Sequence, residues 1–276
     1  MKVFGSQTKM NRDFRCNSSF IKAKKSLGQN FCIDERIPNE IIKELAPNKD
    51  YCVWEIGPGK GALTKRLIET GADIHLFEID KRMEEILESL CPKENITWGD
   101  FLELDPKELP VPTKPLLVCG NLPYYCGTHI IKQFLEKGPT PSRLVFLLQH
   151  EVALKASVPV NHKEYSYLSV HTALFAKARI GNKYGPASFV PQPKIDSSVL
   201  ILEPFQLSEE ERQKRIKALK FISALFTQRR KIALSTLKRT FPETDWAERF
   251  AKLDIDEKAR PENISPEQFL ELFDNL

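Results

Sequence analysis

The stretch that decides the fold is residues 53–67, VWEIGPGKGALTKRL. A β-branched and aromatic run leads into Gly57, Gly59 and Gly61, and a segment with helical periodicity follows. Glycine adopts the backbone conformations of a tight turn and lets a ligand approach the main chain closely. The spacing is G-x-G-x-G, whereas the dinucleotide fingerprint requires G-x-G-x-x-G, which disfavours a nicotinamide oxidoreductase. The stretch predicts a strand, a glycine turn and a helix, and the turn is either a plain connection or a cofactor site.

From this turn onward, short apolar runs alternate with segments of helical period. The alternation predicts βαβ units and a mostly parallel sheet that helices cover on both faces. We expect a last strand pair on either side of ASFVPQPKIDSS, whose two prolines predict no regular structure. The predicted strands are 51–56, 74–79, 95–98, 116–119, 143–148, 178–183 and 198–202, and the predicted helices among them are 62–70, 81–90 and 128–137.

After Pro204 the pattern becomes helical throughout, which predicts a small separate all-α domain. Ser208 and Ser265 precede helical segments and are candidate N-caps, because a serine hydroxyl can accept a hydrogen bond from an exposed N–H of the first turn. The predicted helices are 209–226, 229–239, 245–253 and 266–273. The expected organisation is a basic flexible tail over 1–20, an α/β domain over 21–205 and a helical domain over 206–276.

Composition narrows the class of protein. The 276 residues are 41% hydrophobic and 28% charged, and no apolar run approaches the roughly 20 residues of a membrane span, so we expect neither a membrane protein nor a disordered one. Six cysteines without a C-x-x-C pair and five histidines without ligand spacing predict no metal site and no disulfide framework. The expectation is a cytoplasmic protein with reduced thiols; an organelle transit peptide in the basic N-terminus is the alternative.

Two carboxylates follow the next predicted strands. Glu78 lies near the end of the second strand, and Asp100 follows the third. In open α/β sheets ligands bind at the carboxyl ends of strands, where an acidic residue accepts hydrogen bonds from ribose hydroxyls. Asp100 could accept a hydrogen bond from an adenine amino group. With the glycine turn, this order of residues resembles a class I S-adenosylmethionine-dependent methyltransferase.

The fourth predicted strand leads into GNLPYY, where Asn121, Leu122, Pro123 and Tyr124 form a rigid turn. The exocyclic nitrogen of adenine is a poor nucleophile, so a site that methylates it must orient it toward the methyl donor. The side-chain oxygen of Asn121 and the carbonyl of Leu122 can accept its N–H groups, and Tyr124 offers a face for stacking. The turn predicts methylation of a planar amino nitrogen; its plain alternative is a polar turn with half-buried aromatic residues.

The colinear motifs KKSLGQNF, EIGPGKGALT, GDFLELD, GNLPYY, SFVPQPKIDSSV and AxPENISPEQF resemble the KsgA-type ribosomal RNA adenine dimethyltransferases from about residue 24 to 269. The resemblance implies a Rossmann-like methyltransferase fold with a mostly parallel seven-stranded sheet, a small C-terminal all-α domain, and S-adenosylmethionine as cofactor. It implies stacking of a flipped adenine between Tyr124 and Phe189. The implied cofactor contacts are Asn30, Cys32, Gly57, Gly59, Glu78, Asp100 and Asn121. The chain departs from the family pattern at Cys32, 125–129, His150, Lys155 and Tyr167.

The implied reaction is methyl transfer to N6 of two adjacent adenines near the 3′ end of 16S rRNA, in an immature small ribosomal subunit, by a monomer. Basic residues beside this site favour RNA binding, although a charge run is also typical of a solvated helix face. The candidate RNA contacts are Lys22, Lys24, Lys25, Arg229, Arg230 and Lys231. The alternatives are a resistance-type methyltransferase acting on a 23S rRNA adenine and a non-catalytic RNA-binding assembly or transcription factor.

Overall fold

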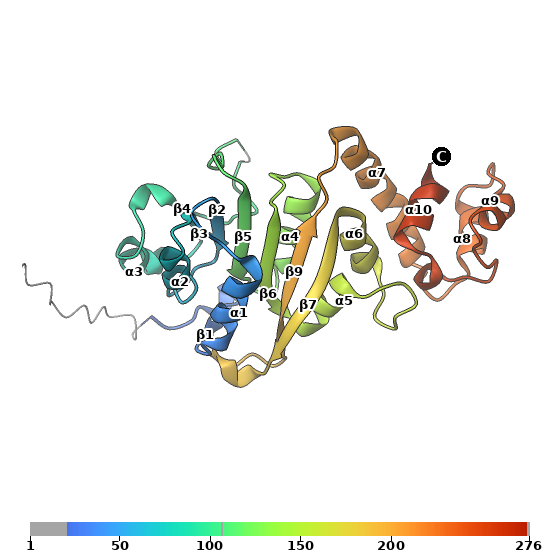
Figure 1. Ribbon diagram of the computed structural model, residues 1–276. Helices are drawn as coiled ribbons and strands as arrows, with labels where there is room; N and C mark the ends of the chain where they lie inside the picture. Colours follow the sequence, from blue (N-terminus) through green and yellow to red (C-terminus); the bar gives the residue numbers. More distant parts are fainter. Residues whose placement is uncertain (1–20, 106, 275–276) are drawn as a thin grey trace, which may run out of the picture.

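A seven-stranded sheet forms the centre of the N-terminal part of the computed structural model, which describes residues 21–105 and 107–274 (Figure 1). The strand order is β4-β3-β2-β5-β6-β9-β7. The strands are β2 (Cys52–Ile56), β3 (Asp73–Glu78), β4 (Ile96–Trp98), β5 (Leu116–Asn121), β6 (Arg143–Gln149), β7 (Ala176–Tyr184) and β9 (Ser197–Pro204). The first five in chain order pair in parallel, and β9 pairs antiparallel with β6 and β7. The predicted α/β fold with a mostly parallel seven-stranded sheet is confirmed.

Alternate residues of each central strand enter two different apolar clusters. On β2, Trp54 and Ile56 face the cluster that includes Phe134 of α4, whereas Val53 faces the cluster that includes Ile41 of α1. A period of two is what a strand covered on both faces requires. The covering helices are α1 (Arg36–Leu45), α2 (Thr64–Glu69) and α3 (Glu84–Glu88) on one face, and α4 (Gly127–Glu136), α5 (His150–Ser157) and α6 (Tyr167–Phe175) on the other.

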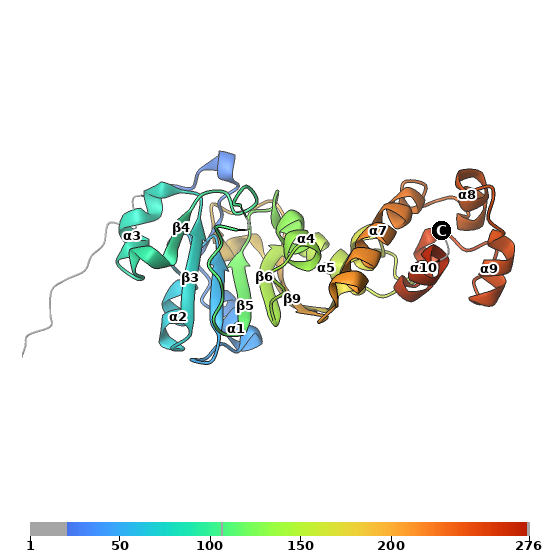
Figure 2. The ribbon, with the colours of Figure 1, turned by 90° about the horizontal axis from the view of Figure 1, so that it is seen from above.

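Four helices form the C-terminal unit: α7 (Glu209–Phe226), α8 (Ala233–Thr240), α9 (Trp246–Lys252) and α10 (Pro266–Phe273). They lie at the end of the molecule far from α3 (Figure 2). Phe221 and Trp246, stacked at 6.0 Å between ring centroids, belong to the same apolar cluster as the α4 face of the sheet. Arg212 donates to the Leu135 carbonyl at 2.7 Å, which caps the end of α4. The helical unit therefore packs against the part of the molecule that contains the sheet.

Most predicted elements agree with the structure, including the N-caps: Ser208 Oγ accepts the N–H of Glu211 at 3.2 Å. The helix predicted over 229–239 is wrong at its start, because α8 begins at Ala233 and residues 229–231 form the turn after α7. The expectation of no regular structure around the two prolines is also wrong, since Phe189–Val190 forms β8 and pairs antiparallel with β1 (Phe31–Cys32). The predicted flexible tail, 1–20, lies outside the described residues.

Candidate active site

The glycine turn follows β2 directly and adopts the geometry predicted for it. Gly57, Gly59 and Gly61 have φ of 71°, 53° and 75°, a region that favours glycine. The Gly57 N–H donates to the carbonyl of Phe77 at 2.9 Å, so the turn is tied to the end of β3. The space beside Gly57 is open except for the Asn121 carbonyl oxygen, 3.8 Å from where a Cβ would stand. The turn can therefore admit a ligand close to its backbone.

Glu78 ends β3 and is 3% exposed. Its two carboxylate oxygens accept the N–H groups of Gly59, at 2.9 Å, and Asp80, at 2.8 Å. Burial raises the pKa of Glu78, and these two hydrogen bonds oppose the rise. A buried carboxylate fixed against the glycine turn is placed to accept hydrogen bonds from a bound diol. Asp100, two residues beyond β4, accepts the N–H of Leu102 at 3.0 Å.

A segment that we call the lid, residues 24–32, covers the glycine turn and is tied to the end of β3. Gln29 bridges the two: its Oε1 accepts the Lys24 N–H and its Nε2 donates to Asp80 Oδ2, both at 2.8 Å. Arg82 donates to Asp80 Oδ1 at 2.8 Å, and this hydrogen bond lowers the pKa of Asp80 to about 2. At the other end of the lid, the Phe31 ring lies 4.7 Å from Lys60 Nζ.

Asn121 is the last residue of β5 and faces the lid. Its Nδ2 donates to the Asn30 carbonyl at 3.1 Å, which fixes the orientation of the amide. Within 21–105 and 107–274, no donor bonds to Asn121 Oδ1, so that oxygen is available to an incoming N–H. Tyr124 is held at the same loop, with its hydroxyl 2.9 Å from Ser197 Oγ. The loop thus presents an acceptor atom and an aromatic ring to one cavity.

The lid, the glycine turn and this loop enclose a cavity of about 70 Å³. Ligand pockets for small molecules are usually about 300–1,000 Å³, so the space beneath the lid is smaller than such a pocket. A second cavity of about 40 Å³ adjoins it beneath Cys32 and Asn121. The walls include the lid residues Gly28, Gln29 and Asn30 together with Gly57, Glu78, Asn121, Leu122, Pro123 and Tyr124.

Glu55 is a buried acidic residue that the sequence analysis did not select. Its side chain is 2% exposed in the wall of the smaller cavity, and its Oε2 accepts the Thr64 hydroxyl at 2.7 Å. Burial raises the pKa of Glu55 to about 8, so this carboxyl holds a proton at neutral pH. Glu55 could have been selected from the sequence by its position in EIGPG, because an acidic residue there lies on the buried strand that leads into the glycine turn. A neutral acid there can both donate and accept a hydrogen bond.

Two predicted contacts lie side by side across a strand pair, because Cys32 of β1 is in register with Phe189 of β8. Cys32 is half-buried and lines the smaller cavity. Phe189 is only 1% exposed and packs in the apolar cluster that includes Ile37 and Tyr184. Its ring has no free face in this conformation, so stacking of a base between Tyr124 and Phe189 requires the Phe189 ring to turn outward. That role stays a prediction.

The side chains predicted to contact RNA are of two kinds: some are exposed, and one is hydrogen-bonded to other residues of the protein. Lys22, Lys24 and Lys25 are exposed at the start of the lid, and Arg230 and Lys231 are exposed in the turn after α7. Arg229 is engaged: its Nε donates to Glu262 Oε2 and its Nη2 to the Lys163 carbonyl, both at 2.7 Å. In the part of the chain that the structure describes, no cluster of His, Cys, Asp and Glu could hold a metal ion, and no helix is long and apolar enough to cross a membrane.

The arrangement of glycine turn, terminal carboxylate and Asn-Leu-Pro-Tyr loop along the carboxyl edge of this sheet defines a methyltransferase of the Rossmann-like class. A family model described as ribosomal RNA adenine dimethylase matches residues 20–276. The chain belongs to this family, which confirms the predicted resemblance and the enzyme class.

Curated relatives and solved structures agree with this assignment. The chain is 34% identical to "Ribosomal RNA small subunit methyltransferase A" of Lactobacillus helveticus, over 94% of this chain and 93% of the relative. It is 36% identical to the protein of the same name in Clostridium botulinum, over 96% and 98%. The fold is similar to a dimethyladenosine transferase from Plasmodium falciparum, with a TM-score of 0.72, 23% identity and coverage of 88% and 95%. It is also similar to the 23S rRNA methyltransferase ErmE, with a TM-score of 0.67, 25% identity and coverage of 89% and 98%.

Proposed function

We propose that the protein transfers methyl groups from S-adenosylmethionine to N6 of two adjacent adenines near the 3′ end of 16S rRNA. The products are N6,N6-dimethyladenosines, made during assembly of the small ribosomal subunit. The observation that carries the proposal is the amide of Asn121, a residue that lines the cavity: its Nδ2 donates to the Asn30 carbonyl, and its Oδ1 has no donor among the described residues. The names of the relatives, small subunit methyltransferase A, support the choice of rRNA.

The residues present fit S-adenosylmethionine. Gly57 leaves space beside its backbone, and the buried Glu78 carboxylate is held where ribose hydroxyls could donate to it. Asp100 is proposed at the adenine, and Asn30 and Cys32 beside the methionine end. When bound, the cofactor supplies an electrophilic sulfonium methyl group. The cavity of about 70 Å³ is smaller than a usual small-molecule pocket, and we propose that the lid moves outward as the cofactor binds.

The protein's contribution to methyl transfer is orientation of the acceptor. Asn121 Oδ1 and the Leu122 carbonyl accept the two N–H groups of the adenine amine, which points the nitrogen lone pair at the methyl group. Pro123 keeps this turn rigid, and the Tyr124 ring stacks on the extracted base. A base–aromatic stack contributes about 1–3 kcal/mol, comparable with the cost of unstacking. The methylated nitrogen is cationic and loses its proton to water, so no general base is required.

The other parts of the molecule are proposed to hold the RNA. Residues 21–205 form the methyltransferase domain, and residues 206–276 form a helical RNA-binding domain. Lys22, Lys24 and Lys25 on one side, and Arg230 and Lys231 on the other, neutralise phosphates. We further propose that the enzyme acts as a monomer in the cytoplasm on an immature small subunit.

The test is a methylation assay with unmethylated small subunits and radiolabelled S-adenosylmethionine, followed by mapping of dimethyladenosine on the rRNA. We expect label in two adjacent adenines near the 3′ end of 16S rRNA. Large subunits serve as the matched control substrate, because structural similarity to ErmE favours 23S rRNA as the second candidate. Label confined to 23S rRNA would overturn the proposed substrate. Failure to bind S-adenosylmethionine in calorimetry would favour a non-catalytic RNA-binding factor.

A further inference from the structure

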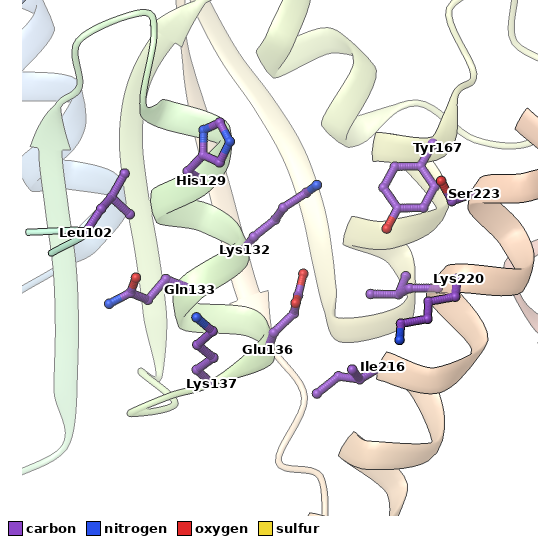
Figure 3. Close-up of a pocket in the computed structure, with 11 residues that line it drawn as sticks. Leu102, His129, Lys132, Gln133, Glu136, Lys137, Tyr167, Ile216, Lys220 and Ser223 are labelled. Carbon is purple, nitrogen blue, oxygen red and sulfur yellow. The ribbon is translucent and has the colours of Figure 1, made fainter. Parts of the chain in front are cut away.

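A wide cleft separates α4 and α6 from α7, at the junction of the two domains. Its volume is about 670 Å³, nearly ten times that of the cavity beneath the lid. Lys132 of α4 reaches across it toward Tyr167 of α6, and Lys220 of α7 points into the same space (Figure 3). Ile216 and Leu219 form an apolar part of the wall. The cleft therefore combines an aromatic ring, apolar surface and cationic side chains.

The aromatic ring and a lysine are already paired. Lys132 Nζ lies 5.2 Å from the centroid of the Tyr167 ring, which is a cation–π contact. Tyr167 is only half-buried and Lys220 is exposed, so both are reachable from solvent. A flat aromatic group that displaces the ammonium from the ring would leave the charge of Lys132 beside it. An unpaired nucleotide offers both features, a base to stack and a phosphate to pair.

Glu136, the acidic side chain that lines the cleft, is hydrogen-bonded to a residue of α6. Its Oε1 accepts a hydrogen bond at 2.7 Å from Nε2 of His171, which is fully buried. That hydrogen bond lowers the pKa of Glu136. Glu136 therefore keeps its negative charge, but Lys132, Lys137 and Lys220 outnumber it, and the cleft favours an anion.

The cleft is also continuous with the catalytic loop along α4. The helix begins at Gly127, directly after the Asn-Leu-Pro-Tyr loop, and His129 on its first turn lines the cleft. Leu102, two residues after Asp100, lines it as well. From His129 to Glu136 the helix rises by about 10 Å, so the cleft lies within a few nucleotides of the methylation site.

We propose that this cleft binds an unpaired nucleotide of the RNA substrate outside the methylation site, with its base on Tyr167 and its phosphate between Lys132 and Lys220. This inference rests on the proposed function, because it assumes an RNA substrate. The site would anchor the strand on the domain junction while a target adenine occupies the cavity at Asn121. Its occupant is a nucleotide that is not methylated.

The test compares binding of unmethylated small subunits by wild-type protein and by Tyr167→Ala, Tyr167→Phe, Lys132→Ala and Lys220→Ala. Tyr167→Ala should weaken binding at least about fivefold, whereas Tyr167→Phe keeps the stacking face and the affinity. Each lysine variant should reduce the slope of log affinity against log salt by about 0.7–0.9. Lys43→Ala is the matched control, because Lys43 is exposed on α1, across the sheet from the cleft. In each cleft variant KM should rise while kcat at saturating subunit stays unchanged.

The outcomes separate the two proposals. If the wild-type protein methylates 16S rRNA and the cleft variants bind subunits as Lys43→Ala does, the cleft proposal is wrong and the proposed function stands. If the wild-type protein neither binds nor methylates small subunits, the proposed function itself fails. Thermal unfolding identifies any variant that does not fold. Lys220→Ala replaces an exposed side chain, so its salt dependence decides the question even if Tyr167→Ala is unstable.

Discussion

The cavity beneath the lid has a volume of about 70 Å³, whereas the cleft between α4, α6 and α7 has about 670 Å³. Around the first, short side chains are fixed by hydrogen bonds: Glu78 to Gly59, Gln29 to Asp80, and Asn121 to Asn30. Around the second, three long lysine side chains and one tyrosine line the wall. Side chains held by hydrogen bonds can keep a reacting group in one orientation, which favours catalysis. Flexible lysine side chains contribute to the affinity for an anionic ligand instead. Single substitutions should therefore have large effects on the first and modest, salt-dependent effects on the second.

The largest effect is expected for Asn121→Ala. The substitution removes the only oxygen at this side chain that can accept the adenine N–H, so the rate of methyl transfer should fall by roughly two to three orders of magnitude. Affinity for S-adenosylmethionine should change much less, because Gly57 and Glu78 remain. Single-turnover methylation and calorimetry measure the two quantities separately.

Asn121→Asp provides the matched control for this substitution. It retains an acceptor oxygen but loses the Nδ2 donor to the Asn30 carbonyl, so it should bind the lid less well and remain more active than Asn121→Ala. Near-normal turnover by Asn121→Ala would refute the orienting role of Asn121. It would also contradict the expectation that single substitutions have larger effects at the cavity beneath the lid than at the cleft.

The next effect concerns Glu55, whose folded-state pKa of about 8 lies well above its ordinary value of 4.5. The folded protein keeps a proton that the unfolded chain releases, so the stabilisation is complete below the ordinary pKa and is lost as pH rises through about 8. Between about pH 5 and pH 8 the free energy of unfolding should fall by about 3 kcal/mol from this group alone. Urea unfolding across that range measures the loss.

Glu55→Gln isolates the contribution of this carboxyl. The amide cannot ionise, and its oxygen can still accept the Thr64 hydroxyl that now bonds to Glu55 Oε2. The variant should therefore lack this part of the pH dependence and equal or exceed the wild-type protein in stability near pH 8. Parallel pH profiles for the two proteins would show that Glu55 is ionised in the folded state.

A smaller effect is expected for Gln29→Ala, which removes the bridge between the lid and Asp80. Two hydrogen bonds are lost from the closed lid, one of them to a carboxylate, so the affinity for S-adenosylmethionine should fall roughly tenfold. The faster release of the cofactor should account for most of the loss, and stopped-flow displacement measures it. Arg36→Ala is the control, because Arg36 is 78% exposed just beyond the lid and pairs with Asp34. Equal affinities for both variants would show that the bridge does not hold the lid.

The residues of the lidded site could be selected from the sequence, whereas those of the cleft could not, for a physical reason. Gly57, Glu78 and Asn121 follow or end strands, and the parallel pairing of β2, β3 and β5 brings strand ends to one edge of the sheet. The hydrogen bond between Gln29 and Asp80 joins residues 51 positions apart, and no local pattern encodes it. The same is true of the cleft: Lys132, Tyr167 and Lys220 come from three helices that are brought together because α7 packs on α6 and α6 packs on α4.

Three secondary-structure errors have physical explanations. The second of the predicted helices 209–226 and 229–239 begins later than predicted, at Ala233, whose N–H bonds to the carbonyl of Ala259. The helix α1 was missed although Ile37, Ile41 and Leu45 recur at helical spacing and are buried. For Phe189, the prolines around it concealed a short strand that exists only because β1 of the lid pairs with it.

The smallest expected effects separate two neighbouring arginines in the turn after α7. Arg229 bonds to Glu262 and to the Lys163 carbonyl, so Arg229→Ala should lower the free energy of unfolding by about 0.5–1 kcal/mol. Arg230 is exposed, so Arg230→Ala should leave stability unchanged and instead reduce the salt dependence of small-subunit binding by about one phosphate contact. Urea unfolding and binding at several salt concentrations measure both quantities for both variants. The reverse pattern, with Arg230 stabilising the fold and Arg229 alone setting the salt dependence, would move the RNA contact to the residue that the structure shows tied to Glu262.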